Sequence, residues 1–252
     1  MPYREKRIHC GNYLDVKVYP VTKEERRQPR RRKKQQESRE AQKILNDMKS
    51  AENMRHIIEC NFTEKDFYTT LTYSDTYIPN SVENAQKDLD NWIKSINRER
   101  KKLGLPNLKY VAVTEFHEGE RKVRIHHHIV MDGLMDRNTV ERKWKKGRVN
   151  AQMLQPNEQG FEQLANYLSK SFRTEKGKKK WKRSRGNLVK PDIRINDHKY
   201  SRRKVLEISR CPEDNTIFEK IYKGYTFTYC KTSVNKMTDG VYLHIRMRKI
   251  QI

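Results

Sequence analysis

Two histidines separated by one residue are the feature of the sequence best suited to chemistry. His126 and His128 lie in residues 124–131, a run typical of a strand. Because side chains alternate between the two faces of a strand, both imidazoles point the same way and His127 points the other way. Two imidazoles on one face can bind the same metal ion. The alternatives are ordinary hydrogen-bonded histidines or a purification tag, and the position far from either end argues against a tag.

Glu115 is the side chain best placed to complete such a site. It lies near the end of a predicted strand at residues 108–116, and a turn then leads into the strand with the histidines. In that hairpin Glu115 falls roughly opposite residues 124–126, and a set of two imidazoles and one carboxylate suits Mn²⁺ or Mg²⁺. An ordinary surface carboxylate and a salt bridge to Arg124 are the alternatives. Asp132 has the parity of the two histidines, but the glycine after it favours a turn.

A tyrosine on a later helix is a candidate nucleophile. Residues 158–172 have helical spacing, and Tyr167 lies roughly 120° from the centre of their apolar stripe, with Lys170 on the same side. A phenol with a pKa near ~10 must be activated before it attacks a phosphodiester, and tyrosine is a known covalent catalyst. A metal ion would polarise the phosphate, and Lys170 could stabilise the transition state or move protons. A lone tyrosine on a helix is most often a packing residue, so this prediction depends on the histidine strand.

The chain is strongly basic, with 56 Lys and Arg against 32 Asp and Glu and a formal net charge of +24. A polyanionic partner is expected, nucleic acid first and an anionic membrane surface second. The candidate DNA contacts lie in two basic runs and are Arg30, Arg31, Arg32, Lys178, Lys179, Lys180, Trp181 and Arg183. Their cations would bind phosphates, and the tryptophan would stack on an unpaired base. The alternative is that both runs are solvated charge.

Several other classes of protein are disfavoured. No apolar run approaches the ~20 residues that span a bilayer, and residues 1–10 lack the apolar core of a secretion signal, which predicts a soluble, cytoplasmic protein with nucleic acid and no membrane as its partner. The four cysteines form no C-x-x-C pair, so free thiols are expected and a zinc knuckle is not. No G-x-x-x-x-G-K-[ST] loop occurs, so neither a nucleotide cofactor nor an attached helicase is expected.

Alternating and helical patterns predict a mixed α and β fold. A capping motif at Asn80 and Glu83 opens a helix that Gly104 ends, and Asp136 opens a second helix that runs until Gly147. Strands are predicted at residues 13–19, 67–73, 108–116, 124–131, 149–154, 225–231 and 241–248. The third and fourth of these should pair as a hairpin, and so should the last two.

Three motifs occur in the order found in the HUH endonuclease superfamily, and the chain resembles its rolling-circle replication initiators from bacterial plasmids and phages. The motifs are Phe-Tyr-Thr-Thr-Leu-Thr at residues 67–72, His-His-His at 126–128 for His-hydrophobic-His, and Tyr-Leu-Ser-Lys at 167–170 for Tyr-x-x-Lys. The resemblance spans about residues 62–175. It has two departures: the middle histidine is not apolar, and one tyrosine rather than two occupies the third motif. A single nucleophile leaves termination to a second subunit or a water.

The resemblance implies an α+β fold in which a central antiparallel sheet is flanked by helices around a ferredoxin-like or RRM-like core. Residues 62–175 would be the catalytic domain, preceded by a strand and a basic helical arm at 1–61 and followed by a basic loop and a β-hairpin at 176–252. The enzyme would nick single-stranded or origin hairpin DNA with Mn²⁺ or Mg²⁺. It would keep the 5′ phosphate on Tyr167 and leave a 3′ hydroxyl for the host polymerase, with a host helicase as a further partner.

Two rival functions stay open. A relaxase or a single-tyrosine transposase would use the same chemistry in conjugation or transposition, although such transposases are usually shorter and relaxases usually arrange their histidines differently. A nucleic-acid-binding protein without catalysis is the second rival. If the protein had no catalytic function, the occurrence of the histidine and tyrosine motifs in the family's order would be a coincidence.

Overall fold

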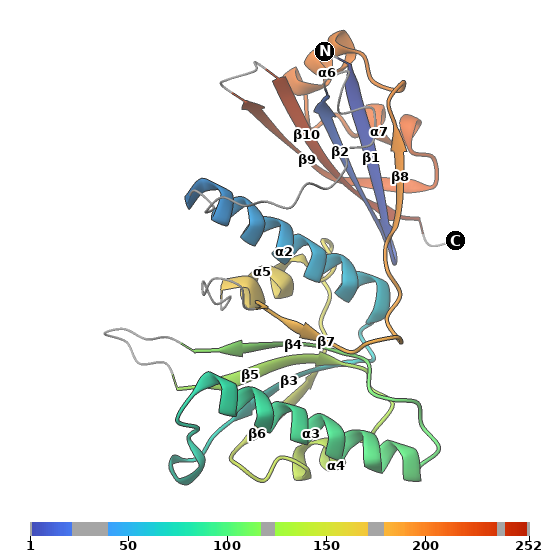
Figure 1. The fold of residues 1–252 in the computed structure, drawn as a ribbon. Coiled ribbons are helices and arrows are strands. Elements are labelled where there is room, and N and C mark those ends of the chain that lie inside the picture. The colour runs from blue at the N-terminus through green and yellow to red at the C-terminus, as the bar shows by residue number, and fades with distance from the viewer. Residues whose placement is uncertain (1, 22–39, 117–123, 171–178, 236–239, 251–252) are drawn as a thin grey trace. The chain divides into compact units, whose positions relative to one another are not determined.

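The computed structural model describes residues 2–21, 40–116, 124–170, 179–235 and 240–250. They form two compact units: unit 1 comprises Met1–Ser38 and Lys190–Ile252, and unit 2 comprises Arg39–Val189. Each unit contains a five-stranded antiparallel sheet with helices packed on it (Figure 1). The predicted α+β class, with an antiparallel sheet flanked by helices, is confirmed.

The sheet of unit 2 has the order β6-β3-β5-β4-β7. Its strands are β3 (Phe67–Thr72), β4 (Tyr110–Glu115), β5 (His126–Met131), β6 (Val149–Met153) and β7 (Lys182–Arg183). The predicted hairpin of β4 and β5 is confirmed, and its register places Glu115 opposite His126. On the other side of β5, Thr70 of β3 lies opposite His128. The histidine strand is therefore central, with a neighbour on each side to fix its side chains.

Helices cover both faces of this sheet, as Figure 1 shows. The pair α3 (Val82–Lys102) and α4 (Arg137–Arg142) covers one face, and the pair α2 (Glu40–Asn61) and α5 (Glu162–Lys170) covers the other. Leu71 and Ile129 pack toward α3, whereas Val111 and Val130 pack toward α2 and α5. Since neighbouring residues of a strand face opposite ways, this packing decides which helices each polar side chain meets.

The ends of two helices differ in part from the predictions. Ser81, not Asn80, caps α3 by accepting a hydrogen bond from the backbone N–H of Asn84, because its extended backbone places the hydroxyl there; the predicted capping box was one residue off. Gly104 follows α3 with φ +70°, the left-handed conformation expected of a C-terminal glycine. The cap of α4 at Asp136 is confirmed.

Helix α4 ends at Arg142, earlier than predicted. Gly147 lies beyond it in a loop against β3, where a Cβ atom would come 2.2 Å from the backbone oxygen of Thr72. This glycine therefore permits a close backbone approach rather than a helix end.

The sheet of unit 1 joins the two ends of the sequence. Its order is β8-β1-β2-β10-β9, with β1 (Tyr3–Cys10), β2 (Tyr13–Pro20), β8 (Asp192–Asn196), β9 (Tyr225–Asn235) and β10 (Gly240–Lys249). Helices α6 (Arg202–Arg210) and α7 (Asn215–Ile221) contribute to its core. The predicted strand at 13–19 and the C-terminal hairpin are confirmed. The first strand, β8 and both helices were not predicted.

Two short elements complete the description, the helical turn η1 (Asp75–Tyr77) and the edge strand β7. Of the helices in the described ranges, none is both long enough and apolar enough to cross a membrane. The basic segment containing Arg30, Arg31 and Arg32 lies outside the described residues, as does Lys178.

Candidate active site

Glu115, His126 and His128 form a compact triangle of ligand atoms on the face of the sheet that α2 and α5 cover. The Nε2 atoms of His126 and His128 are 3.0 Å apart. Glu115 Oε2 lies 3.3 Å from His126 Nε2 and 3.2 Å from His128 Nε2. For metal–ligand bonds of about 2.1 Å, the edge of a ligand triangle is ~3.0 Å in an octahedral site and ~3.4 Å in a tetrahedral one. The observed edges lie in this range, so the triangle has the size of one face of a metal coordination shell.

Hydrogen bonds on the far side of each ring turn the Nε2 lone pairs toward this triangle. His126 Nδ1 donates to the backbone oxygen of Arg124 at 2.8 Å, which leaves Nε2 unprotonated in the neutral ring. His128 Nδ1 lies 2.6 Å from the hydroxyl of Tyr68 and 3.3 Å from that of Thr70. Outer hydrogen bonds of this kind are typical of metal-binding histidines.

Burial keeps His128 in the form that binds a cation. It lowers the pKa of His128 to about 4, and the neighbouring His126 contributes to the shift. The neutral His128 imidazole offers a lone pair at pH 7, and His126 Nε2 and Glu115 Oε2 supply two further donor atoms. Three electron-pair donors that converge on one point repel one another unless protons or a metal cation lie between them. The donor set therefore fits a divalent metal ion held by Glu115, His126 and His128.

His127 faces away from this triangle and is fully buried on the α3 side of the sheet. Its Nε2 lies 2.9 Å from the hydroxyl of Tyr73 and its Nδ1 lies 3.0 Å from that of Thr114. Both ring nitrogens are thus occupied by hydrogen bonds, and Trp144 packs edge-on against the ring. This geometry assigns His127 to the core and leaves the outer two histidines as the pair that can share a metal ion.

Tyr167 lies beside the triangle on α5. Its ring is in edge contact with that of His128, with 5.4 Å between the centroids, and 49% of the residue is exposed. Its helix neighbours Ala165 and Leu168 are buried in the core. An exposed phenol next to a candidate metal site can reach a substrate from solvent, whereas a packing tyrosine would be buried. Lys170 is exposed at the last residue of the helix.

Tyr68 belongs to the site, although the sequence pattern predicted no role for it. It stacks on His128 with the ring planes 15° apart, and its hydroxyl bonds to Nδ1 of that ring. Burial raises the pKa of Tyr68 well above its usual range, and Tyr167 adds to the rise, so the hydroxyl stays protonated. Strand parity could have found it, because residues 68, 70 and 72 lie opposite 130, 128 and 126.

The contacts of Arg124 and Asp132 test two alternatives to the predicted metal site, a salt bridge from Arg124 to Glu115 and a turn role for Asp132. Arg124 pairs with Asp75 in the described structure, and Glu115 contacts the histidines. Asp132 lies at the end of β5, where Arg100 binds one carboxylate oxygen at 2.7 Å and the backbone N–H of Lys109 binds the other. Asp132 also accepts a hydrogen bond from the backbone N–H of Leu134 at 3.3 Å, as the predicted turn role requires, whereas its ion pair with Arg100 was not predicted.

The part of the second basic run that the structure describes begins at Lys179 and belongs to unit 2. Lys180 pairs with Asp47, and Trp181 Nε1 donates to Ser50 Oγ at 3.1 Å. The Arg183 guanidinium lies 5.6 Å from the centroid of the Trp181 ring. Lys179 is exposed. Whether these side chains bind DNA stays a prediction.

Residues 66–172 match the model of a family described as "Replication-associated protein ORF2/G2P". The matched segment lies entirely within unit 2 and contains Tyr68, Glu115, His126, His128 and Tyr167. Over this segment the chain is similar to replication-associated proteins. No curated protein and no solved structure matches the chain.

Proposed function

We propose that the chain is a metal-dependent, single-strand DNA nickase and strand-transferase of the HUH type that initiates rolling-circle replication. One observation carries the proposal: an exposed tyrosine, Tyr167, lies in ring contact with His128, whose Nε2 converges with Nε2 of His126 and Oε2 of Glu115. A nucleophile and a candidate metal site are thereby adjacent on one face of the sheet. The match to a replication-associated family supports the biological setting.

In the proposed reaction, the Tyr167 hydroxyl oxygen attacks the phosphorus of a phosphodiester. The bond from phosphorus to the 3′ oxygen breaks as the bond to the phenol oxygen forms. The phenol proton is given up, and the departing 3′ oxygen gains one, so the products are a 5′-phosphotyrosine and a free 3′ hydroxyl. A divalent ion, Mn²⁺ or Mg²⁺, held by Glu115, His126 and His128 would polarise the non-bridging oxygens and offset their growing charge.

The other residues orient this chemistry. The Tyr68 hydroxyl orients the His128 ring through a hydrogen bond to its Nδ1. The backbone oxygen of Arg124 orients the His126 ring in the same way. Their fixed geometry lowers the reorganisation needed in the transition state. Lys170 lies one turn after Tyr167 on α5 and would place a cation near the phosphate or take part in proton transfer. The covalent product conserves the bond energy, so a later 3′ hydroxyl can reverse the reaction and reseal the strand.

The test is a search for a covalent adduct. Single-stranded oligonucleotides labelled at the 3′ end and tiled across the gene and its flanking DNA are incubated with the protein and Mn²⁺, then run on a denaturing gel. Wild type is expected to transfer label to the protein from one site, and EDTA abolishes the transfer. Tyr167→Phe is expected to form no adduct, while Tyr229→Phe, in unit 1, forms as much as wild type.

Two results would contradict the proposal. Absence of any adduct with Mn²⁺ or Mg²⁺ would exclude nicking by covalent catalysis and favour a non-catalytic DNA-binding protein. An adduct that persists in Tyr167→Phe would reject Tyr167 as the nucleophile. A relaxase or a transposase would also form the adduct, and the position of the cleaved site distinguishes these functions: an origin hairpin indicates replication, and a transposon end indicates transposition.

A further inference from the structure

A basic groove lies along the β7 edge of the sheet in unit 2, and no role in the proposed reaction requires it. Its volume is about 1190 Å³, and its walls come from α2, α3, β4 and residues 179–187. Pockets for drug-sized ligands measure roughly 300–1,000 Å³, so the groove is larger than a small molecule needs. Its size favours a chain-like ligand.

The polar side chains that line the groove are mainly cations and amides. The lining contains five cations and six amide side chains, and within the described part of the chain no carboxylate lines the groove. Lys180 and Lys182 are neutralised by pairing with Asp47 and Asp90. Lys179, Arg183 and Arg185 have no carboxylate partner among the described residues, so three positive charges remain for an anion.

The opposite walls supply hydrogen-bonding groups rather than charges. Asn53 of α2, Gln86 of α3 and Asn107 form no side-chain hydrogen bond with the described residues. An amide offers both donors and acceptors, as the edge of an unpaired base does. Trp181 is fixed in the groove by its hydrogen bond to Ser50 and by the Arg183 guanidinium. Cations, amides and a fixed aromatic ring together are typical of sites that bind single-stranded nucleic acid.

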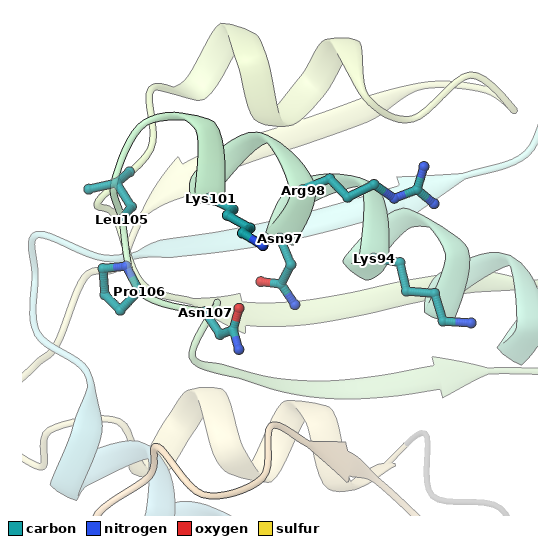
Figure 2. A pocket seen from close by; sticks show the side chains of 7 residues that line it. All are labelled: Lys94, Asn97, Arg98, Lys101, Leu105, Pro106 and Asn107. Carbon is teal, nitrogen blue, oxygen red and sulfur yellow. The ribbon is translucent and has the colours of Figure 1, made fainter.

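The groove extends in two directions. A second pocket of about 540 Å³ shares Asn97 and Asn107 with it, and Figure 2 shows these two side chains close together, with the side chains of Lys94 and Arg98 extending to the right. Lys94, Arg98 and Lys101 are exposed. At the other end the groove reaches Thr114, the residue before the candidate metal ligand Glu115.

We infer that this groove binds the single-stranded DNA that flanks the nick site; the inference rests on the proposed function. The groove follows β4 from Tyr110 to Thr114, which is about 13 Å at ~3.3 Å per residue. The Thr114 side chain lies with His127 on the α3 face and Glu115 points to the other face, so a strand leaving the groove at Thr114 passes the end of β4 to reach the candidate active site. Single-stranded rather than duplex DNA is favoured because a duplex hides its base edges in its grooves, whereas the amide and tryptophan side chains here require exposed bases.

Binding is measured by fluorescence anisotropy with a labelled 12-nucleotide single strand of mixed sequence and with the matching duplex. The protein carries Tyr167→Phe, and EDTA is present, so cleavage cannot contribute. The groove variant is Lys179→Ala/Arg183→Ala/Arg185→Ala. The control variant, Lys65→Ala/Arg142→Ala/Lys145→Ala, removes three exposed cations elsewhere in unit 2.

The groove variant is expected to bind the single strand roughly 10- to 100-fold more weakly, and the slope of log K against log salt should fall by about 2, since each phosphate contact contributes ~0.7. The control variant should change single-strand affinity less than about 3-fold. A second pair guards against misfolding: Asn53→Asp/Asn107→Asp places carboxylates in the groove and should weaken binding several-fold, whereas Asn84→Asp/Asn91→Asp, on α3 outside it, should not.

Two outcomes overturn the inference. Groove variants that bind the single strand as well as their controls would remove the groove from DNA recognition. Equal losses for single strand and duplex would assign the cations to a general basic surface. The binding test is independent of catalysis. If the wild-type protein forms no adduct but the groove variants lose single-strand binding, the role of the groove is supported and only the proposed nicking is contradicted.

Discussion

Replacing His127 by glutamine separates the structural histidine from the two metal-binding candidates. His127 is fully buried, with its ring nitrogens bonded to Tyr73 and Thr114. Glutamine keeps a donor and an acceptor but cannot be protonated near neutral pH. The substitution therefore removes the titration while preserving hydrogen-bonding capacity.

The magnitude follows from the pKa of this imidazole. Burial, with smaller contributions from His126 and His128, lowers the pKa of His127 from 6.5 to about 3. Below pH 6.5 the unfolded chain binds a proton that the folded chain does not, so the free energy of unfolding falls as the pH falls toward 3. Between pH 7 and pH 5 the loss from this one residue is roughly 2 kcal/mol, at about 1.4 kcal/mol per pKa unit.

Urea unfolding at pH 7 and at pH 5 measures the effect. The decrease in unfolding free energy on acidification should be about 2 kcal/mol smaller in His127→Gln than in wild type. His198→Gln in unit 1 provides the matched control, because that side chain is exposed and is solvated in both states. Adduct formation by His127→Gln at pH 7 should stay within about 3-fold of wild type.

A His127→Gln protein with an unchanged pH dependence would refute the assignment of a neutral, buried imidazole. Loss of Mn²⁺ binding in a variant that still folds would refute the conclusion that only the outer two histidines belong to the metal site. His198→Gln must show the same pH dependence as wild type for the first comparison to hold.

Four further outcomes are expected. Tyr68→Phe should weaken Mn²⁺ binding about 10-fold by calorimetry, since it removes the hydrogen bond that orients His128; an unchanged affinity would contradict this. Glu115→Gln should abolish the adduct at low Mn²⁺, and excess Mn²⁺ should restore part of it. Arg100→Ala should cost about 3–5 kcal/mol in urea unfolding, because it leaves a buried carboxylate unpaired. Because burial raises the pKa of Cys230 to about 12, iodoacetamide at pH 7 should label it far more slowly than exposed Cys211, by mass spectrometry.

Much of the candidate site could be predicted because its residues lie close together in the chain or share a simple parity. The two-residue period of a strand fixes the common side of His126 and His128 and the opposite side of His127. A hairpin is a local structure, so the position of Glu115 opposite His126 also followed from the sequence. The off-stripe position of Tyr167 on its helix follows from 3.6 residues per turn.

Unit 1 shows why other parts of the fold were not predictable. Strand β1 contains Glu5, a buried carboxylate in a segment whose polar residues disguise the strand pattern. The Glu5 side chain has polar partners in the core, because Lys199 lies 3.1 Å away and the Tyr222 hydroxyl donates to it at 2.6 Å. These partners are about 200 residues distant along the chain. Local patterns contain no information about contacts at that separation.

The sequence by itself determined the chemistry that is available: two imidazoles and a carboxylate that can share one cation, and a tyrosine displaced from its helix core. Only the tertiary structure decided that these groups meet, by packing α5 on the face of the sheet to which His126 and His128 point. It also added Tyr68 and the β7 groove, whose parts come from separate strands and helices. Residue type and period are local properties of a chain, whereas adjacency depends on which hydrophobic faces are buried together.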